Sequence, residues 1–242
     1  MDTSEIMIKS KERVKQHGEV FTGEETVNDM MNITEDFKKE SYVIGSTWLE
    51  PSCGNGNFLV EILKRKLESA ACLHDNGENY DLNVIRAVSA VYGVDIQFDN
   101  VLEAQERMIE LFKEMYTEHM KAEPNKNIMD CVRAIISINI MLGNTLISKM
   151  LKMKNWRRNC GKTTVGTRAF EGDALALMDG DQSKAKTVDM QTVRFVFDGD
   201  MVTVNTSGLM DTVEIPMGFK AVKYDKVYQL VDKLYEDEDE DI

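Results

Sequence analysis

Residues 49–59 of this chain read LEPSCGNGNFL and carry its strongest structural signal. An apolar stretch that begins at residue 42 leads into Glu50, and an amphipathic stretch begins at Phe58. This order predicts a strand, a tight glycine turn and a helix. The glycines let the backbone approach a ligand closely, and the start of the helix offers free N–H groups. The segment therefore predicts a ligand-binding turn at the end of a strand.

The length and composition indicate a globular protein. The 242 residues are 43% hydrophobic and 29% charged, which predicts one α/β domain with a small appendage. No apolar run approaches the ~18–20 residues of a membrane span, and residues 1–5 show no signal-peptide pattern. We therefore expect no membrane partner and a cytoplasmic location.

The cysteines and histidines do not follow a metal-binding pattern. Cysteines stand at positions 53, 72, 131 and 160 without any C-x-x-C spacing, and the histidines are at 17, 74 and 119. This spacing argues against a structural zinc site or a disulfide framework. We expect no metal and interpret the thiols as buried small apolar groups.

The charge is strongly acidic but unevenly distributed. A net charge of −13 argues against broad affinity for nucleic acids, which depends on Lys and Arg neutralising phosphates. Residues 236–241 are all acidic, and we expect the tail 236–242 to be disordered. The segment Lys149–Arg168 holds seven basic residues and no acidic one. It is interpreted either as a solvated helix face and loop or as a patch that contacts DNA phosphates.

Hydrophobic periodicity predicts alternating helices and strands up to residue 146, hence a parallel sheet, and antiparallel strands after it. Helices are expected at residues 5–16, from about 24, and at 57–72, 82–90, 99–121, 128–138 and 223–235. Strands are expected at 42–50, 91–96 and 138–142, and at 192–197 and 201–205, which form a hairpin. Thr22 is expected to cap the helix that follows it, with Glu25 completing a capping box. The chain is thus divided at residues 150 and 235.

Four segments, in this order, resemble the cofactor-binding motifs of the N6-adenine DNA methyltransferases. They are HGEVFT at 17–22 with the apolar residues near 27–31, the glycine turn at 49–58, GVDI at 93–96 and IMLGNTL at 140–146. The resemblance covers roughly residues 14–147. It implies S-adenosylmethionine as the cofactor, DNA methylation as in restriction–modification systems, and a Rossmann-like class I methyltransferase sheet with helices on both faces. Residues 151–235 would add a small β-rich part.

The resemblance also implies a role for each matching residue. Glu50, Pro51, Cys53, Gly54 and Gly56 would contact the methionine and sulfonium end, Asp95 and Ile96 the ribose, Asn144 the adenine, and Thr22 the cofactor carboxylate, while Phe58 packs beneath the turn. Taken singly, Asp95 is also interpreted as a strand-end cap, Asn144 as a turn residue and Thr22 as a helix cap. Gly23 departs from the family, which usually has proline there, and residues 72–90 resemble an insertion.

The catalytic motif of the family, [D/N/S]-P-P-[Y/F/W], is missing. The prolines stand at 51, 124 and 216, so none are adjacent. Trp156 and Phe170 are the nearest aromatic candidates for stacking on a flipped base, and the catalytic residues stay unknown.

Three hypotheses follow from these motifs. The first is a small or truncated DNA methyltransferase, which a second protein chain would complete by supplying the catalytic loop or target recognition. Alternatively, the chain is a catalytically inactive methyltransferase-like protein that regulates or binds a partner. A third possibility is a methyltransferase with a different acceptor.

Overall fold

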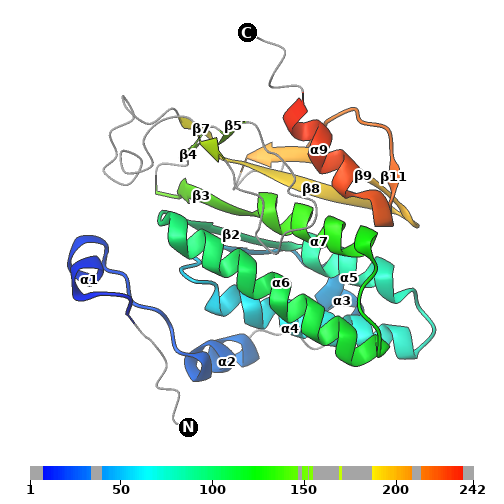
Figure 1. The fold of residues 1–242 in the computed structure, drawn as a ribbon, viewed down its shortest axis with the longest axis horizontal. Coiled ribbons are helices and arrows are strands. Elements are labelled where there is room, and N and C mark those ends of the chain that lie inside the picture. Colours follow the sequence, from blue (N-terminus) through cyan, green and yellow to red (C-terminus); the bar gives the residue numbers. More distant parts are fainter. Residues whose placement is uncertain are drawn as a thin grey trace.

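Figure 1 shows the fold in a computed structural model, which describes residues 8–33, 40–146, 149–151, 153–154, 169–170, 187–208 and 214–236. The helices are α1 (Lys11–His17), α2 (Glu24–Ile33), α3 (Glu40–Gly45), α4 (Asn57–Asp75), α5 (Tyr80–Ser89), α6 (Phe98–Met120), α7 (Lys126–Asn139) and α9 (Tyr228–Glu236), with the 3-10 helix η2 (Tyr224–Lys226). The strands are β1 (Trp48–Glu50), β2 (Val91–Asp95), β3 (Ile140–Asn144), β4 (Lys149–Leu151), β5 (Met153–Lys154), β6 (Ala169–Phe170), β7 (Thr187–Asp189), β8 (Gln191–Asp198), β9 (Met201–Gly208), β10 (Ile215–Pro216) and β11 (Val222–Lys223).

The central sheet has the order β1-β2-β3-β4-β7. Its first three strands are parallel, with Glu50 opposite Gly93 and Asp95 opposite Leu142. Strands β4 and β7 continue the sheet in antiparallel pairing. The predicted change from parallel to antiparallel strands is therefore confirmed, and the mixed α/β architecture is compatible with a Rossmann-like fold. Because β2 lies between β1 and β3, the carboxyl end of β2 stands in the middle of the parallel strands.

Helices α4 to α7 cover one face of the parallel strands. Gly93 of β2 faces α4, because a Cβ placed on it would lie 2.7 Å from the side chain of Leu59. The side chains on the opposite face of these strands, those of Leu49, Val94 and Met141, form a separate cluster with Met190. Helices on both faces were expected, but the described part of the chain shows helices on one face and Met190 against the other.

The predicted first strand is wrong at its beginning. Residues 42–44 belong to α3, and β1 starts at Trp48. Lys66 of α4 is fully buried, and its Nζ donates to the carbonyl oxygens of Val43 and of Ser46, the latter at 2.6 Å. These bonds satisfy carbonyls at the end of α3 that have no partner within so short a helix. The contacts of Lys66 with residues 20 or more positions earlier thus favour a helix over a strand at residues 42–44.

Other boundaries differ by a few residues. Gly23, rather than Thr22, precedes α2, and its carbonyl accepts from the N–H of Val27 at 2.9 Å. Helix α7 continues through Ile138 and Asn139, so β3 begins two residues later than expected. The connection between the helices expected at 57–72 and 82–90 is shorter than predicted, since α4 ends at Asp75 and α5 begins at Tyr80.

The C-terminal elements follow the expected pattern. Strands β8 and β9 form the predicted hairpin around a turn at Gly199 and Asp200. Val202 and Val204 of β9, together with Val227 and Leu230, pack into the same hydrophobic core as helices α4 to α7. Most of the basic segment and the acidic residues 237–242 lie outside the described residues. Among the described helices, none has the length and apolar character to cross a membrane.

Candidate functional site

The glycine turn lies between β1 and α4, as the sequence predicts. Gly54 has φ +51° and Gly56 has φ +92°, values that favour glycine because a Cβ is strained there. The N–H of Cys53 donates to the carbonyl of Val94 at 2.9 Å, so the turn is attached to the end of β2. The main chain of the turn is therefore fixed by both its own torsions and the neighbouring strand.

Asp95, at the end of β2, is engaged by the protein itself. Its carboxylate accepts from the N–H groups of Gly54 at 2.9 Å and Gln97 at 2.8 Å, and from Asn100 Nδ2 at 3.3 Å. The residue is 7% exposed, and burial raises the pKa of its carboxyl group although these N–H donors act in the opposite direction. A carboxylate offers about four acceptor positions, so three donors leave little room for a ribose diol. The contacts are those of a strand-end cap; the ribose role stays a prediction.

Protein atoms occupy the space that both glycines leave open. A Cβ on Gly54 would lie 3.1 Å from the ring of Phe21, and one on Gly56 would lie 2.9 Å from the Cβ of Ala104 in α6. Phe21 belongs to the HGEVFT segment, and the carbonyl of the next residue, Thr22, accepts from Asn57 Nδ2 at 2.8 Å. The N-terminal loop therefore lies directly on the turn.

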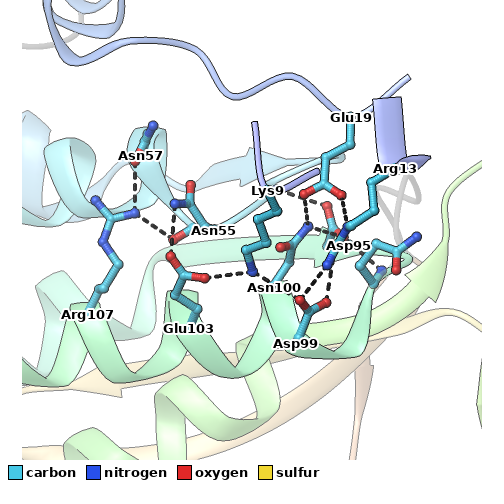
Figure 2. A network of polar contacts seen from close by, with 12 residues as sticks. Lys9, Arg13, Glu19, Asn55, Asn57, Asp95, Asp99, Asn100, Glu103 and Arg107 are labelled. Atoms are coloured by element: carbon cyan, nitrogen blue, oxygen red, sulfur yellow. Dashed lines mark hydrogen bonds and ion pairs between the residues drawn. The ribbon is translucent and has the colours of Figure 1, made fainter. Parts of the chain in front are cut away.

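Figure 2 shows a network of polar contacts that joins the N-terminal segment, the turn and α6. Lys9 and Arg13 pair with Asp99, Lys9 also with Glu103, and Arg13 also with Glu19, while Arg107 donates to the carbonyl of Asn55 and to Asn57 Oδ1. Burial alone would raise the pKa of Asp99, but hydrogen bonds from Arg13 and Lys9 hold it below its usual range. The sequence carries no local signal for this network, because most of its partners are 50 residues or more apart in the chain.

A cavity of about 140 Å³ opens between the N-terminal loop and the turn. Its walls include five residues that the sequence predicts for cofactor binding: Thr22, Glu50, Cys53, Gly54 and Phe58. They also include Val20, Phe21, Ser52, Asn55 and Asn57, which sequence reasoning missed although they lie within the same two motifs. The structure thus brings the HGEVFT segment and the glycine turn together around one cavity.

The remaining predicted site residues do not line this cavity. Gly56 is buried against α6, and Ile96 is half-buried next to Asp95. Pro51 is exposed, and its carbonyl accepts from Thr145 Oγ1 at 3.0 Å. Asn144 ends β3, and its Oδ1 accepts from the N–H of Leu146 at 3.1 Å, as in a turn.

Glu50 is the chemically distinctive group of the cavity. Its Oε1 accepts from the N–H of Ser52 at 3.2 Å, and burial raises the pKa of its carboxyl group. Within the described residues, no Lys, Arg or His nitrogen forms an ion pair with it. A half-buried carboxylate without a cationic partner is costly, and a cationic ligand would relieve that cost.

The two buried thiols, Cys53 and Cys131, are poor nucleophiles. Cys53 and Cys131 are buried, as expected, and burial raises the pKa of both, that of Cys131 to about 12. Cys72 is exposed, against expectation. Cys160 lies outside the described residues.

A possible metal-ligand set lies away from the turn, at the ends of α4 and α6. His74, Asp75 and His119 bring one ligand atom each within 4.8 Å of one another, the one such set among the residues searched. His74 Nδ1 and His119 Nε2 are 2.8 Å apart, so the two rings already share a hydrogen bond. The sequence gives no local pattern for this set, because its histidines lie on two different helices and come together only through the packing of those helices.

Comparison with models of protein families gives no match to this chain. Curated proteins and solved structures give no match either. A function for the chain is therefore inferred from its own residues and their geometry.

Proposed function

We propose that this chain binds S-adenosylmethionine at the cavity beside the glycine turn, and that it is a methyltransferase-like protein acting on DNA adenine. The observation that carries the proposal is Glu50, a half-buried carboxylate with a raised pKa, no cationic partner among the described residues, and a place in the wall of the cavity. S-adenosylmethionine carries both a sulfonium and an ammonium cation. The resemblance of the surrounding motifs to the adenine methyltransferases supports this choice of cation.

The cavity fits one end of that cofactor. Ligand pockets commonly measure about 300–1,000 Å³, whereas this cavity measures about 140 Å³. It is therefore suited to the methionine end, with Glu50 facing the positive charge and Thr22 and the turn N–H groups near the carboxylate. The nucleoside would lie outside it. Asp95 would hold the turn in place rather than hold the ribose, because its carboxylate already accepts from Gly54, Gln97 and Asn100.

When bound, the cofactor supplies a methyl group on a sulfonium centre. The chain's own contribution is to bind and orient that end. It has no adjacent prolines, so the family motif that holds an adenine amino group is absent. We infer that methyl transfer requires a second chain that supplies this motif, and that the basic segment Lys149–Arg168 contributes phosphate contacts.

A second candidate function is a catalytically inactive protein that acts through interactions. The engaged carboxylate of Asp95 favours it, because that group is occupied by the protein's own donors. In this case the methyltransferase-like fold would serve as a scaffold. Turnover, rather than binding, separates the two candidates.

The first experiment is titration calorimetry with S-adenosylmethionine and S-adenosylhomocysteine. The variant is Glu50→Gln, which keeps the shape and removes the charge, and the matched control is Glu68→Gln on the exposed side of α4. We expect micromolar binding to the wild type and a loss of at least about tenfold in Glu50→Gln. The loss should be larger for S-adenosylmethionine, because S-adenosylhomocysteine lacks the sulfonium charge.

Affinity should also fall as the pH is lowered toward 5. The carboxyl group must be deprotonated to attract a cation, and its pKa is raised above the usual range. Glu50→Gln should show no such dependence. Absence of binding to the wild type, or equal effects of the two substitutions, would contradict the proposal. Methyl transfer to DNA by the chain alone would contradict the need for a second chain.

A further inference from the structure

A second cavity lies at the opposite end of the parallel strands. It measures about 480 Å³ and is lined by the ends of α3 and α4, by α5, by Tyr92 of β2 and by β8. Ala90, which directly precedes β2, lies in its wall, whereas the glycine turn follows the carboxyl end of β1. None of its lining residues belongs to the cavity beside the glycine turn. The two cavities are therefore separate sites.

Arg194 of β8 supplies a guanidinium group to the wall of this cavity. Its Nη1 donates to Thr47 Oγ1 at 3.1 Å, and its guanidinium lies 5.5 Å from the ring centre of Tyr92. These two contacts fix the orientation of the group. Its Nε, by contrast, is buried and has no hydrogen-bond partner. A buried guanidinium N–H without an acceptor is costly.

Arg86 of α5 brings a second guanidinium to the same cavity. Its carbon Cζ lies 5.3 Å from the ring centre of Phe197, and its Nη2 donates to the carbonyl of Gly199 at 3.2 Å. Within the described residues, neither Arg86 nor Arg194 forms an ion pair with a carboxylate. Two arginines held over aromatic rings without acidic partners are unusual in a chain with a net charge of −13.

The rest of the wall defines the kind of ligand. Tyr92, Phe195 and Phe197 provide aromatic surface, and Glu78 provides a carboxylate that already accepts from Asn83 Nδ2 at 2.8 Å. A carboxylate has further acceptor positions, which suit the hydroxyl groups of a sugar. The volume lies within the range of small-molecule sites, about 300–1,000 Å³. Guanidinium groups match phosphate oxygens in geometry and charge.

We propose that this cavity binds a small phosphorylated ligand of nucleotide size, with Arg86 and Arg194 contacting the phosphate and the aromatic walls contacting the planar ring. The phosphate supplies an anionic partner to two guanidinium groups that form no ion pair within the described residues. The proposal does not depend on cofactor binding at the glycine turn, because it rests on residues of the other end of the sheet.

The test is titration calorimetry with adenosine 5′-monophosphate, with inorganic phosphate and adenosine as separate probes. The variants are Arg86→Met and Arg194→Met, and the matched control is Arg133→Met in α7, which does not line the cavity. Arg194→Lys keeps the charge but removes the Nε donor, and it guards against a variant that fails to fold. Glu50→Gln shows whether the nucleotide enters the glycine-turn cavity instead.

We expect the nucleotide to bind more tightly than either probe, and to lose at least tenfold in affinity in both methionine variants. Arg194→Lys should retain part of the affinity, and Arg133→Met and Glu50→Gln should bind as the wild type does. No nucleotide binding at millimolar concentration would overturn the proposal. So would equal affinities for inorganic phosphate and nucleotide, or a loss caused by Glu50→Gln but not by Arg86→Met.

Discussion

Replacing Lys66 by methionine tests how a buried amine holds the approach to the glycine turn. Lys66 is fully buried in α4, and its Nζ donates to carbonyl oxygens of Val43 and Ser46. Methionine keeps most of the volume but removes both of these bonds. The Val43 carbonyl retains the hydroxyl of Ser46 as a donor at 3.0 Å, so the main loss falls on the Ser46 carbonyl. An unsatisfied buried carbonyl costs about 1–3 kcal/mol. The variant also no longer buries an amine, which offsets part of this loss, so we expect a net destabilisation of about 1–3 kcal/mol at pH 7.

The destabilisation should grow as the pH rises. Burial lowers the pKa of Lys66 to about 7, whereas a lysine in the unfolded chain titrates near ~10.4. Between these values the unfolded chain binds a proton that the folded protein does not, so wild-type stability rises with pH. Integrated from pH 7 to 9, this amounts to roughly 2 kcal/mol. The methionine variant lacks this contribution.

Urea unfolding at pH 6, 7, 8 and 9 measures both effects. The control is Lys64→Met, an exposed lysine on the same helix, for which we expect little change at any pH. A difference between wild type and Lys66→Met that is the same at pH 7 and pH 9 would refute a deprotonated Lys66. A stabilising effect of the substitution at pH 7 would refute the role assigned to the two carbonyl contacts.

Three further predictions concern the turn. Glu50→Gln should raise Tm by about 1–2 °C at pH 8, allowing for partial solvent screening, but should leave Tm unchanged at pH 4. The reason is that the folded state raises the pKa of Glu50, so the stability of the wild type falls as this carboxyl group ionises. An unchanged Tm at pH 8 would contradict this. Asp95→Asn should cost about 1–3 kcal/mol and speed amide exchange at Gly54, measured by hydrogen–deuterium exchange; unchanged exchange would remove its role as a cap. Gly56→Ala should lower the urea midpoint of unfolding more than Gly77→Ala does. Both glycines have φ above +90°, so the torsional strain is similar, but only the Cβ at Gly56 meets other atoms, whereas one at Gly77 meets nothing within 4 Å. Equal losses would leave torsional strain as the sole cause.

Local patterns in the sequence predicted much of the fold. The helices α4, α6 and α7 were placed within a few residues, because their apolar residues recur at helical spacing over long stretches. The hairpin of β8 and β9 was found from its Asp-Gly-Asp turn. The error at residues 42–44 arose because three consecutive apolar residues are compatible with either a strand or a short helix. The contact from Lys66 that accompanies the helix is distant in sequence.

The candidate site divides in the same way. Thr22, Glu50, Cys53, Gly54 and Phe58 could be predicted because they lie in two short motifs, and the structure brings those motifs together. The three hydrogen-bond donors to Asp95 could not be predicted, because the sequence pattern of an acid at the end of a strand is the same whether the acid binds a ligand or its own turn. Likewise, Arg86 and Arg194 are more than 100 residues apart, and no local pattern connects them.

The contacts of the N-terminal segment have a consequence for the order of synthesis. Lys9 pairs with Asp99, 90 residues later, and Arg13 with the same carboxylate. The N-terminal segment leaves the ribosome long before α6 is made. Lys9 and Arg13 therefore lack their partners Asp99 and Glu103 while α4 and α5 emerge. Closing so long a loop is entropically costly and slow. Residues 8–23 are thus expected to dock onto the glycine turn only after α6, which anchors them, has been made. A ribosome-bound chain that ends before residue 99 should therefore leave residues 8–23 open to proteolysis.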